Sequence, residues 1–220
     1  TLDNGLRVII HQDESTPIVA VNLAFDVGAR DEDPEMTGLA HYFEHLMFSG
    51  SKNAPDYDIH VQNAGGQNNA FTSNDYTNYY VTLPKTNLEL ALWLESDRMF
   101  QLNLDEKSLE VQRQVVIEEF KQRYLNQPYG NNLAQLRALT YKDHAYKWST
   151  IGKEISHIEM DELQKQNLVS KDDFSLMNKI NLESPYFISA IAAQKMSEFN
   201  GGKIVNLSSL NYLNHLYPLH

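Results

Sequence analysis

The 220-residue sequence has no cysteine, no long hydrophobic run and few basic residues. Without cysteine the chain can form neither disulfides nor thiolate metal sites, so histidine and carboxylate groups are the strong metal ligands that it can offer. Because no run of about 18 apolar residues occurs, we expect no membrane-spanning helix. Only 18 Lys and Arg stand against 29 Asp and Glu, and the formal net charge of -11 argues against nucleic acid or an anionic membrane as the main partner.

The length and composition fit one large or two small globular domains with a substantial core, since 42% of the residues are hydrophobic. The opening residues TLDNGLRVII are typical of the interior of a strand and include neither an initiator Met nor a signal peptide. We therefore expect further chain before Thr1. The compartment is not specified by these residues, and the bacterial periplasm and cytoplasm are the two that fit best.

The hydrophobic pattern predicts an α+β fold, with an antiparallel sheet and helices packed on one of its faces. A helix is expected after Thr37, which is a plausible N-cap, and another from a cap at Asp105 to about Tyr124. The other predicted elements are strands over 6–11, 18–28 and 65–84 and helices over 58–64 and 86–102.

The segment GLAHYFEHLMFSGS, residues 38–51, contains the most informative pattern. On a helix, His41 and His45 are one turn apart on one face, and Glu44 lies close to that face. Two such imidazoles can bind one zinc ion, and the neighbouring carboxylate can take a proton from metal-activated water. The alternative is an amphipathic helix whose polar residues face solvent.

A second predicted helix, QRQVVIEEFKQRY at 112–124, carries Glu118 and Glu119 directly after an apolar run. Catalytic zinc needs a third protein ligand, usually from another element. Carboxylates in apolar surroundings are costly unless they are paired or bind a metal. The alternative is a helix face exposed to solvent. For Glu118 this alternative fits the sequence at least as well as a functional role.

These motifs together resemble the M16 (pitrilysin-like) zinc metallopeptidases, whose H-x-x-E-H motif is followed by a V-V-x-E-E helix. Four further stretches of residues 1 to about 160 agree with that family. They are NGLRVII near the start, G-x-R-D-E before the histidine helix, GGQNNAFTSNDYTNYY at 65–80 and STIGKEISHI at 149–158.

The resemblance implies roles for several residues. His41, His45 and Glu119 would be the ligands of Zn²⁺, and Glu44 would be the general base. Gln112 stands where the family often has a glutamate, so it could hydrogen-bond a ligand or substrate but carries no charge, and Glu118 could support the site in a similar way. The substrate peptide would add as a strand along Asn69, Ala70, Phe71 and Thr72.

The family pattern ends near residue 160. Residues 172–210 resemble instead a segment of the short-chain dehydrogenases/reductases, with Asn181 and Ser209 at that family's helix Asn and catalytic Ser. The glycine-rich cofactor loop is missing, so hydride transfer is not expected. Residues 1–160 are therefore interpreted as a zinc-binding peptidase domain, and 161–220 either complete its sheet or form a fused segment.

The sequence thus predicts the metal-bearing half of a zinc endopeptidase that acts on peptides or small proteins. The resemblance further implies a homologous second half, in cis or in trans, that supplies an arginine and a tyrosine, whereas the last arginine of this chain is Arg137. The alternative is a non-catalytic subunit or peptide-binding module with the same fold. These residues do not identify the substrate or the cleavage preference.

Overall fold

The computed structural model describes residue 1, residues 6–159 and residues 202–209. Within them the strand order of the single sheet is β1-β5-β2-β4-β3. Neighbouring strands are antiparallel, except that β5 runs parallel to β2. The expected α+β class is confirmed, with this parallel pair as an addition. The strands are β1 (Arg7–Asp13), β2 (Ile18–Phe25), β3 (Gln67–Thr72), β4 (Thr77–Pro84) and β5 (Gly202–Ser209).

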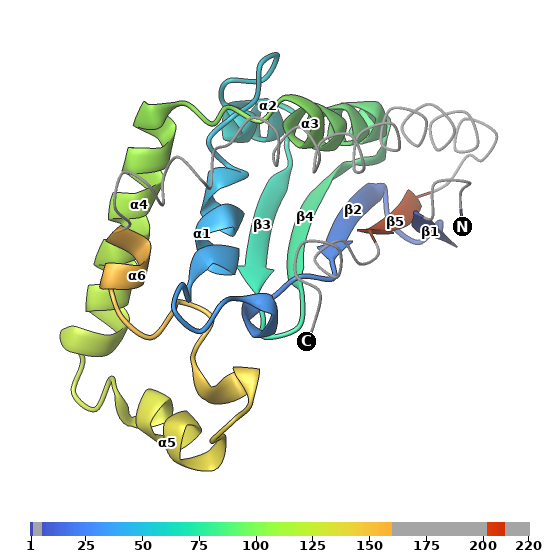
Figure 1. The fold of residues 1–220 in the computed structure, drawn as a ribbon. Coiled ribbons are helices and arrows are strands. Elements are labelled where there is room, and N and C mark those ends of the chain that lie inside the picture. Colours follow the sequence, from blue (N-terminus) through green and yellow to red (C-terminus); the bar gives the residue numbers. More distant parts are fainter. Residues whose placement is uncertain (2–5, 160–201, 210–220) are drawn as a thin grey trace.

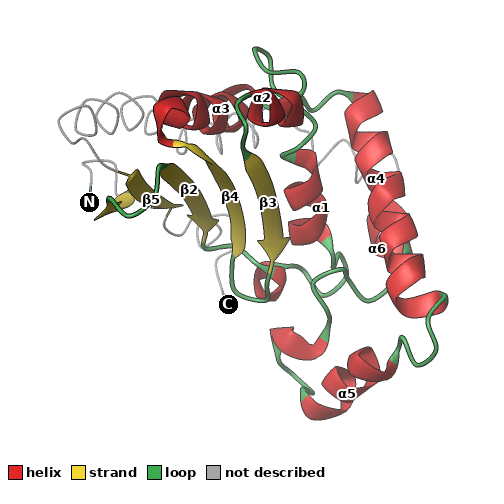
Figure 2. Cartoon of the chain, turned by 180° about the vertical axis from the view of Figure 1, so that it is seen from behind, coloured by secondary structure: helices red, strands yellow, loops and turns green. Residues whose placement is uncertain are grey.

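The helices lie over one face of the sheet and beyond its β3 edge. Helix α3 crosses above the strands, and α1 stands between β3 and α4, as both views show (Figures 1 and 2). No helix in the described part of the chain is long and apolar enough to cross a bilayer. The α-helices are α1 (Leu39–Leu46), α2 (Tyr57–Asn63), α3 (Leu88–Gln101), α4 (Glu106–Phe120), α5 (Asn132–Thr140) and α6 (Ser156–Glu159), and a π-helical turn, η3 (Lys121–Leu125), follows α4.

Residues 65–84 form a hairpin, so the prediction of one strand there was wrong. The Ser73 hydroxyl accepts hydrogen bonds from the backbone N–H groups of Asp75 and Tyr76 at 3.1 and 3.0 Å. The Ser73 N–H in turn donates to the carbonyl of Tyr76 at 2.9 Å. A serine that bonds the backbone two and three residues on stabilises a turn. This turn separates β3 from β4.

The expected N-cap of α1 was also wrong by one residue. Gly38 takes that position, with a φ of 94°, a conformation that glycine adopts without steric cost. A Cβ at Gly38 would lie 2.7 Å from the carbonyl oxygen of Ile151. Thr37 is buried, and its hydroxyl accepts from the backbone N–H of Lys153 and contacts His157 Nδ1, both at 2.9 Å. Thr37 therefore joins the start of α1 to the segment before α6.

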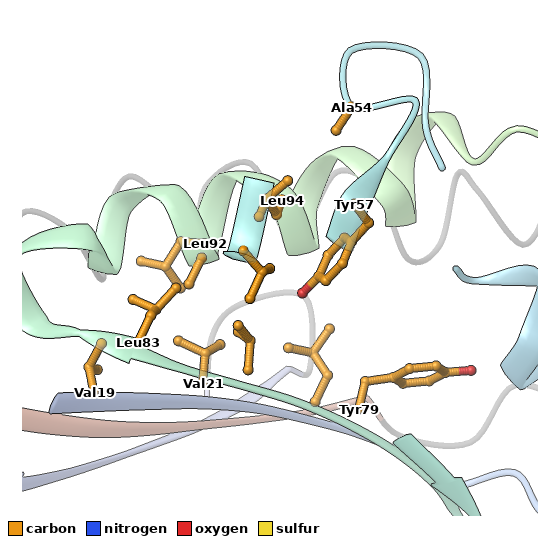
Figure 3. Close-up of a cluster of buried hydrophobic side chains, with 12 residues drawn as sticks. Val19, Val21, Ala54, Tyr57, Tyr79, Leu83, Leu92 and Leu94 are labelled. Atoms are coloured by element: carbon orange, nitrogen blue, oxygen red, sulfur yellow. The ribbon is translucent and has the colours of Figure 1, made fainter. Parts of the chain in front are cut away.

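The main core lies between the sheet and helices α2 and α3 (Figure 3). Alternate residues of β2 point into it, as expected for a strand with one buried face. Burial of each large aliphatic side chain contributes about 1.5–3 kcal/mol. The cluster consists of Val19, Val21, Leu23, Ala54, Tyr57, Val61, Tyr79, Val81, Leu83, Ala91, Leu92 and Leu94.

Strand β5 bears on the two interpretations of the C-terminal segment. Residues 202–209 pair with β1 on one side and β2 on the other, the place expected of a strand that completes the peptidase sheet. Ser209 is the last residue of this strand. Asn181 and the rest of 160–201 lie outside the described residues.

A buried ion pair lies within the core beneath α3. Arg98, which is 2% exposed, donates from Nε and Nη2 to one oxygen of Glu95 at 2.8 and 2.6 Å. The hydroxyl of Tyr57 donates to the other oxygen at 2.6 Å. The guanidinium lies 4.6 and 4.8 Å from the ring centres of Tyr57 and Tyr79. These partners compensate for much of the cost of burying both charges.

Arg98→Met should therefore lower the free energy of unfolding by about 3–5 kcal/mol, because it leaves the Glu95 carboxylate buried without its counter-charge. Urea unfolding of the purified chain measures this loss. The control is Arg113→Met, which removes an ion pair of the same spacing to the half-exposed Glu110 and should cost less than about 1 kcal/mol. Equal losses in the two variants would contradict the prediction.

Candidate metal centre

Helices α1 and α4 bring three metal-ligating side chains together. The Nε2 atoms of His41 and His45 lie 3.5 and 3.4 Å from Oε2 of Glu119. All three ligand atoms lie within 4.8 Å of one another. Two ligands each about 2.0–2.1 Å from a tetrahedral zinc ion are about 3.4 Å apart. The two histidine–carboxylate distances therefore fit a shared metal ion. The two histidines are those of the helical pattern, and Glu119 is the glutamate that the family resemblance implied.

The charge states of these groups also suit a metal. His41 is buried, and burial lowers its pKa to about 4, although Glu119 nearby opposes the shift. Contact with the His45 imidazole lowers the pKa of Glu119 against the opposing effect of burial. Neutral imidazole and ionised carboxylate are the forms that coordinate metals. The Nδ1 atom of His41 is buried and has no hydrogen-bond partner among the described residues.

Glu44 lies on the same helix but outside this group of three ligands. It is buried, and one of its oxygens accepts a hydrogen bond of 2.6 Å from the hydroxyl of Thr72 on β3. Burial raises the pKa of the Glu44 carboxyl above its ordinary value. A fixed carboxylate with a raised pKa beside three metal-ligating side chains suits proton transfer near neutral pH. Thr72 was expected only to pair with substrate, so its contact with Glu44 was not foreseen.

The two neighbouring glutamates of α4 face different ways. The Glu118 side chain is 57% exposed and pairs with Lys121 at 2.6 Å, as its solvated-face alternative expected. Within the described residues, the Glu118 side chain pairs with Lys121 and not with His41 or His45, so its predicted supporting role at the ligands finds no support. Gln112 is half-buried, and its side chain makes no hydrogen bond to the residues that the structure describes.

Glu32, the last residue of the G-x-R-D-E stretch, fixes the start of α1, a role that the sequence analysis did not give it. Its two carboxylate oxygens accept from the backbone N–H groups of Gly38 at 2.9 Å and Ala40 at 2.8 Å. The indole N–H of Trp148 donates to it as well, at 3.1 Å. A carboxylate at a helix N-terminus satisfies free N–H groups and complements the helix dipole. Glu32 thus fixes the first residues of α1, and His41 directly follows Ala40.

Strand β3 is the edge of the described sheet, because it pairs with β4 alone. Hydrogen bonding alternates along an antiparallel pair, and the Ser73–Tyr76 bond directs the main-chain groups of Asn69 and Phe71 towards β4. Those of Ala70 and Thr72 face the open edge. The N–H of Ala70 donates to the side-chain oxygen of Asn69 at 2.8 Å. A substrate strand would have to displace this side chain before it could bond the Ala70 N–H.

The comparison with known proteins agrees with this fold. Residues 7–154 match the profile of Insulinase (Peptidase family M16). The chain belongs to this peptidase family. It is 33% identical, over 215 residues, to the zinc protease PqqE of Helicobacter pylori, an alignment that covers 96% of this chain and 47% of that protein. The chain thus spans about half the length of this curated relative.

Solved structures show the same fold. The crystal structure of a protease from Helicobacter pylori superposes with a TM-score of 0.67 at 29% identity, over 91% of this chain and 43% of that one. Pitrilysin superposes with a TM-score of 0.64 at 22% identity, over 93% of this chain and 20% of its own.

The reductase resemblance of residues 172–210 finds no support in these comparisons. The alignment with the Helicobacter pylori zinc protease covers 96% of the chain and therefore runs through most of that segment. Short matches in an amphipathic helix and a strand arise readily, because both patterns are common in unrelated folds.

Glu32→Gln should lower the free energy of unfolding by about 1 kcal/mol, the usual cost of a lost helix cap, because an amide nitrogen cannot accept a hydrogen bond from a backbone N–H group, whereas both carboxyl oxygens can in either protonation state. Burial raises the pKa of Glu32 from 4.5 to about 7, although its hydrogen bonds act in the opposite direction. The folded wild type therefore retains a proton between these values, and its stability falls as pH rises through this window. The variant lacks this slope.

Urea unfolding of both proteins at pH 5 and pH 8 measures both effects. The wild type should exceed the variant by more at pH 5 than at pH 8. An advantage that grows with pH would contradict this prediction, because it would show that the N–H donors outweigh burial at Glu32.

Proposed function

We propose that this chain is the metal-bearing half of a zinc endopeptidase. The observation that carries the proposal is the convergence of His41 Nε2, His45 Nε2 and Glu119 Oε2 beside a buried carboxylate, Glu44. Donors of two imidazoles and one carboxylate are typical of catalytic zinc, which keeps a further position open. The description of the Helicobacter pylori relative as a zinc protease supports the choice of metal.

In this proposal each residue has a separate task. His41, His45 and Glu119 would hold the zinc ion, which when bound supplies a Lewis acid that polarises a carbonyl oxygen and lowers the pKa of water. Glu44 would accept the proton of the attacking water and deliver it to the leaving amine. Its hydrogen bond from Thr72 keeps the carboxylate in one orientation, and the raised pKa keeps it basic enough for this task.

The open edge of β3 is the proposed binding surface for the substrate peptide. Main-chain groups of Ala70 and Thr72 face that edge, and Thr72 also contacts Glu44. A peptide that pairs there would therefore extend past the base. Recognition through main-chain hydrogen bonds accepts varied sequences, with side-chain pockets adding preference. The exposed ring of Phe71, packed edge-on against Tyr76, would contact the substrate strand from one side.

A homologous second half, in cis or in trans, is the proposed partner. The side chains of His45 and Glu119 are each 24% exposed, so the site is partly open to solvent. Peptide hydrolysis also needs donors for the developing oxyanion and walls that exclude water. Arg137 is not free for this role, because its Nη1 donates to the carbonyls of Trp148 and Tyr146 and to Asn74 at 3.2–3.4 Å.

The 220-residue chain should consequently bind zinc but cleave an unstructured fluorogenic peptide slowly. Addition of the second half should raise the rate at least about 100-fold, the size of effect expected from oxyanion donors alone. Efficient hydrolysis by the purified chain alone would show that it needs no second half. No cleavage by the reconstituted, zinc-loaded pair would favour the non-catalytic alternative.

The variants Glu44→Gln and His45→Ala should distinguish the proposed general base from a proposed zinc ligand. Glu44→Gln should retain one zinc per chain and reduce cleavage by the reconstituted protein at least about 100-fold, because proton transfer is lost. His45→Ala should lose the metal itself. Zinc per chain is measured by atomic emission after dialysis, and cleavage with the same peptide.

Glu118→Gln is the matched control, since it changes the neighbouring but solvent-facing carboxylate and should alter neither quantity. Loss of zinc from the Glu44→Gln protein would make Glu44 a ligand and overturn the assignment.

A further inference from the structure

The two oxygens of the Glu119 carboxylate have different partners. Oε2 faces the Nε2 atoms of His41 and His45 at 3.5 and 3.4 Å. Oε1 forms an ion pair with Nη2 of Arg123, four residues later. The guanidinium therefore occupies the oxygen that the histidines leave free. Neither the family resemblance nor the sequence pattern drew attention to Arg123.

The backbone at Arg123 departs from regular α-helix. Helix α4 ends at Phe120 and continues directly into the π-helical turn η3, in which the N–H of Asn126 donates to the carbonyl of Lys121 at 2.8 Å. Such π turns are rare and occur frequently at functional sites. In this chain the turn begins two residues after Glu119 and contains the residue that pairs with it.

Two contacts hold this turn in place from the protein side. The ring of Tyr124 packs on that of Phe120, with centroids 5.0 Å apart. Gly130 lies so close that a Cβ would be 2.7 Å from the carbonyl oxygens of Arg123 and Tyr124. The main chain of Arg123 is thus fixed, while its side chain, 59% exposed, reaches the carboxylate from the solvent side.

Folding stability does not account for this arrangement, because an ion pair as exposed as Arg123–Glu119 contributes little. The ion pair matters more for the orientation of the Glu119 carboxylate than for folding stability. A glutamate can rotate and can bind a metal through one oxygen or both. A guanidinium on Oε1 restricts both freedoms, since arginine presents its donors in a rigid, planar array.

We propose that Arg123 is a positioning residue of the metal centre: it holds Oε1 of Glu119 so that Oε2 alone is presented to the ion between His41 and His45. This inference rests on the proposed function, which supplies the metal. Groups that hydrogen-bond a metal ligand typically contribute 10–100-fold to metal affinity. Arg123 would also offset part of the negative charge of a carboxylate held in a chain of net charge -11.

Arg123→Ala tests the proposal with zinc ion alone, so that the readout does not depend on cleavage. The dissociation constant for zinc is measured on the purified chain by competition with a chromophoric chelator, and the melting temperature of each metal-free variant is recorded. We expect zinc to bind at least about 10-fold more weakly to Arg123→Ala, with an unchanged melting temperature. Arg123→Lys should restore part of the affinity, because it keeps the charge but not the planar array.

Lys121→Ala is the matched control. It removes an exposed ion pair in the same π turn, to Glu118, which faces away from the site, and should change zinc affinity by less than about twofold. Unchanged affinity in Arg123→Ala, or an equal loss in Lys121→Ala, would overturn the proposal. So would an Arg123→Ala protein with normal zinc affinity but weaker binding of acidic peptides, because Arg123 would then contact substrate.

These outcomes are distinct from failure of the proposed function. If His45→Ala binds zinc as the wild type does, the metal site itself is misassigned. If His45→Ala loses zinc while Arg123→Ala keeps it, only the role of Arg123 is wrong.

Discussion

Helix α1 has only eight residues and must pack against both α4 and β3, and the geometry of the whole site depends on that packing. Tyr42 and Leu46, one turn apart, join Val116, Ile117 and Phe120 in a second hydrophobic cluster. The hydroxyl of Tyr42 also donates to the carbonyl of Leu109 on α4 at 2.7 Å. Because residues four apart share a helix face, fixing this face fixes the adjacent face that carries His41 and His45.

The other side of α1 is tied to the sheet through Glu44 and Thr72. The helix start is held by Glu32, which accepts from Gly38 and Ala40. The helix is therefore fixed at its first residues, at the cluster with α4 and at the edge strand. A rotation about its axis would break at least one of these contacts, so the positions of His41 and His45 are set by the fold itself. Such preorganisation is what the proposed metal centre requires.

Burial of ionisable groups at the site also costs folding free energy. His41 and Glu44 are buried on α1, and burial alone disfavours their charged forms, lowering the pKa of His41 and raising that of Glu44. The structure limits the cost by different means at each group. His41 stays neutral, Glu44 receives the Thr72 hydroxyl, and Glu119 is paired with Arg123 at the surface. Burial of ionisable groups costs folding stability even with these partners, a cost that is common where function and folding conflict.

The sequence predicted the parts of the site that depend on helical periodicity. The spacing of His41 and His45 fixes their common face, and a helix through Glu118 and Glu119 must direct the two carboxylates about 100° apart. Which of the two faces α1 was implied only by the resemblance, and the structure places Glu119 there. Local patterns could not show contacts between distant segments, such as those of Glu32 with α1 or of Thr72 with Glu44.

The fold was predicted in class but not in topology. The Ser73 turn was missed because its signal is side-chain bonding to the backbone rather than a Gly or Pro. The insertion of β5 between β1 and β2 joins residues far apart in the chain, and no local pattern specifies such a pairing. Thr37 does not cap the helix because its hydroxyl bonds the Lys153 N–H and contacts His157 instead, contacts that only the folded structure reveals.

The most direct test of the central claim is an anomalous-difference map, recorded at the zinc absorption edge from crystals of the chain grown with zinc. We expect one strong peak per chain, about 2.0–2.1 Å from Nε2 of His41 and of His45 and about 2.0–2.2 Å from Oε2 of Glu119, with Arg123 on Oε1. A peak at any other set of side chains, or a zinc ion bound by Glu44 or Glu118 in place of Glu119, would contradict the proposed metal centre.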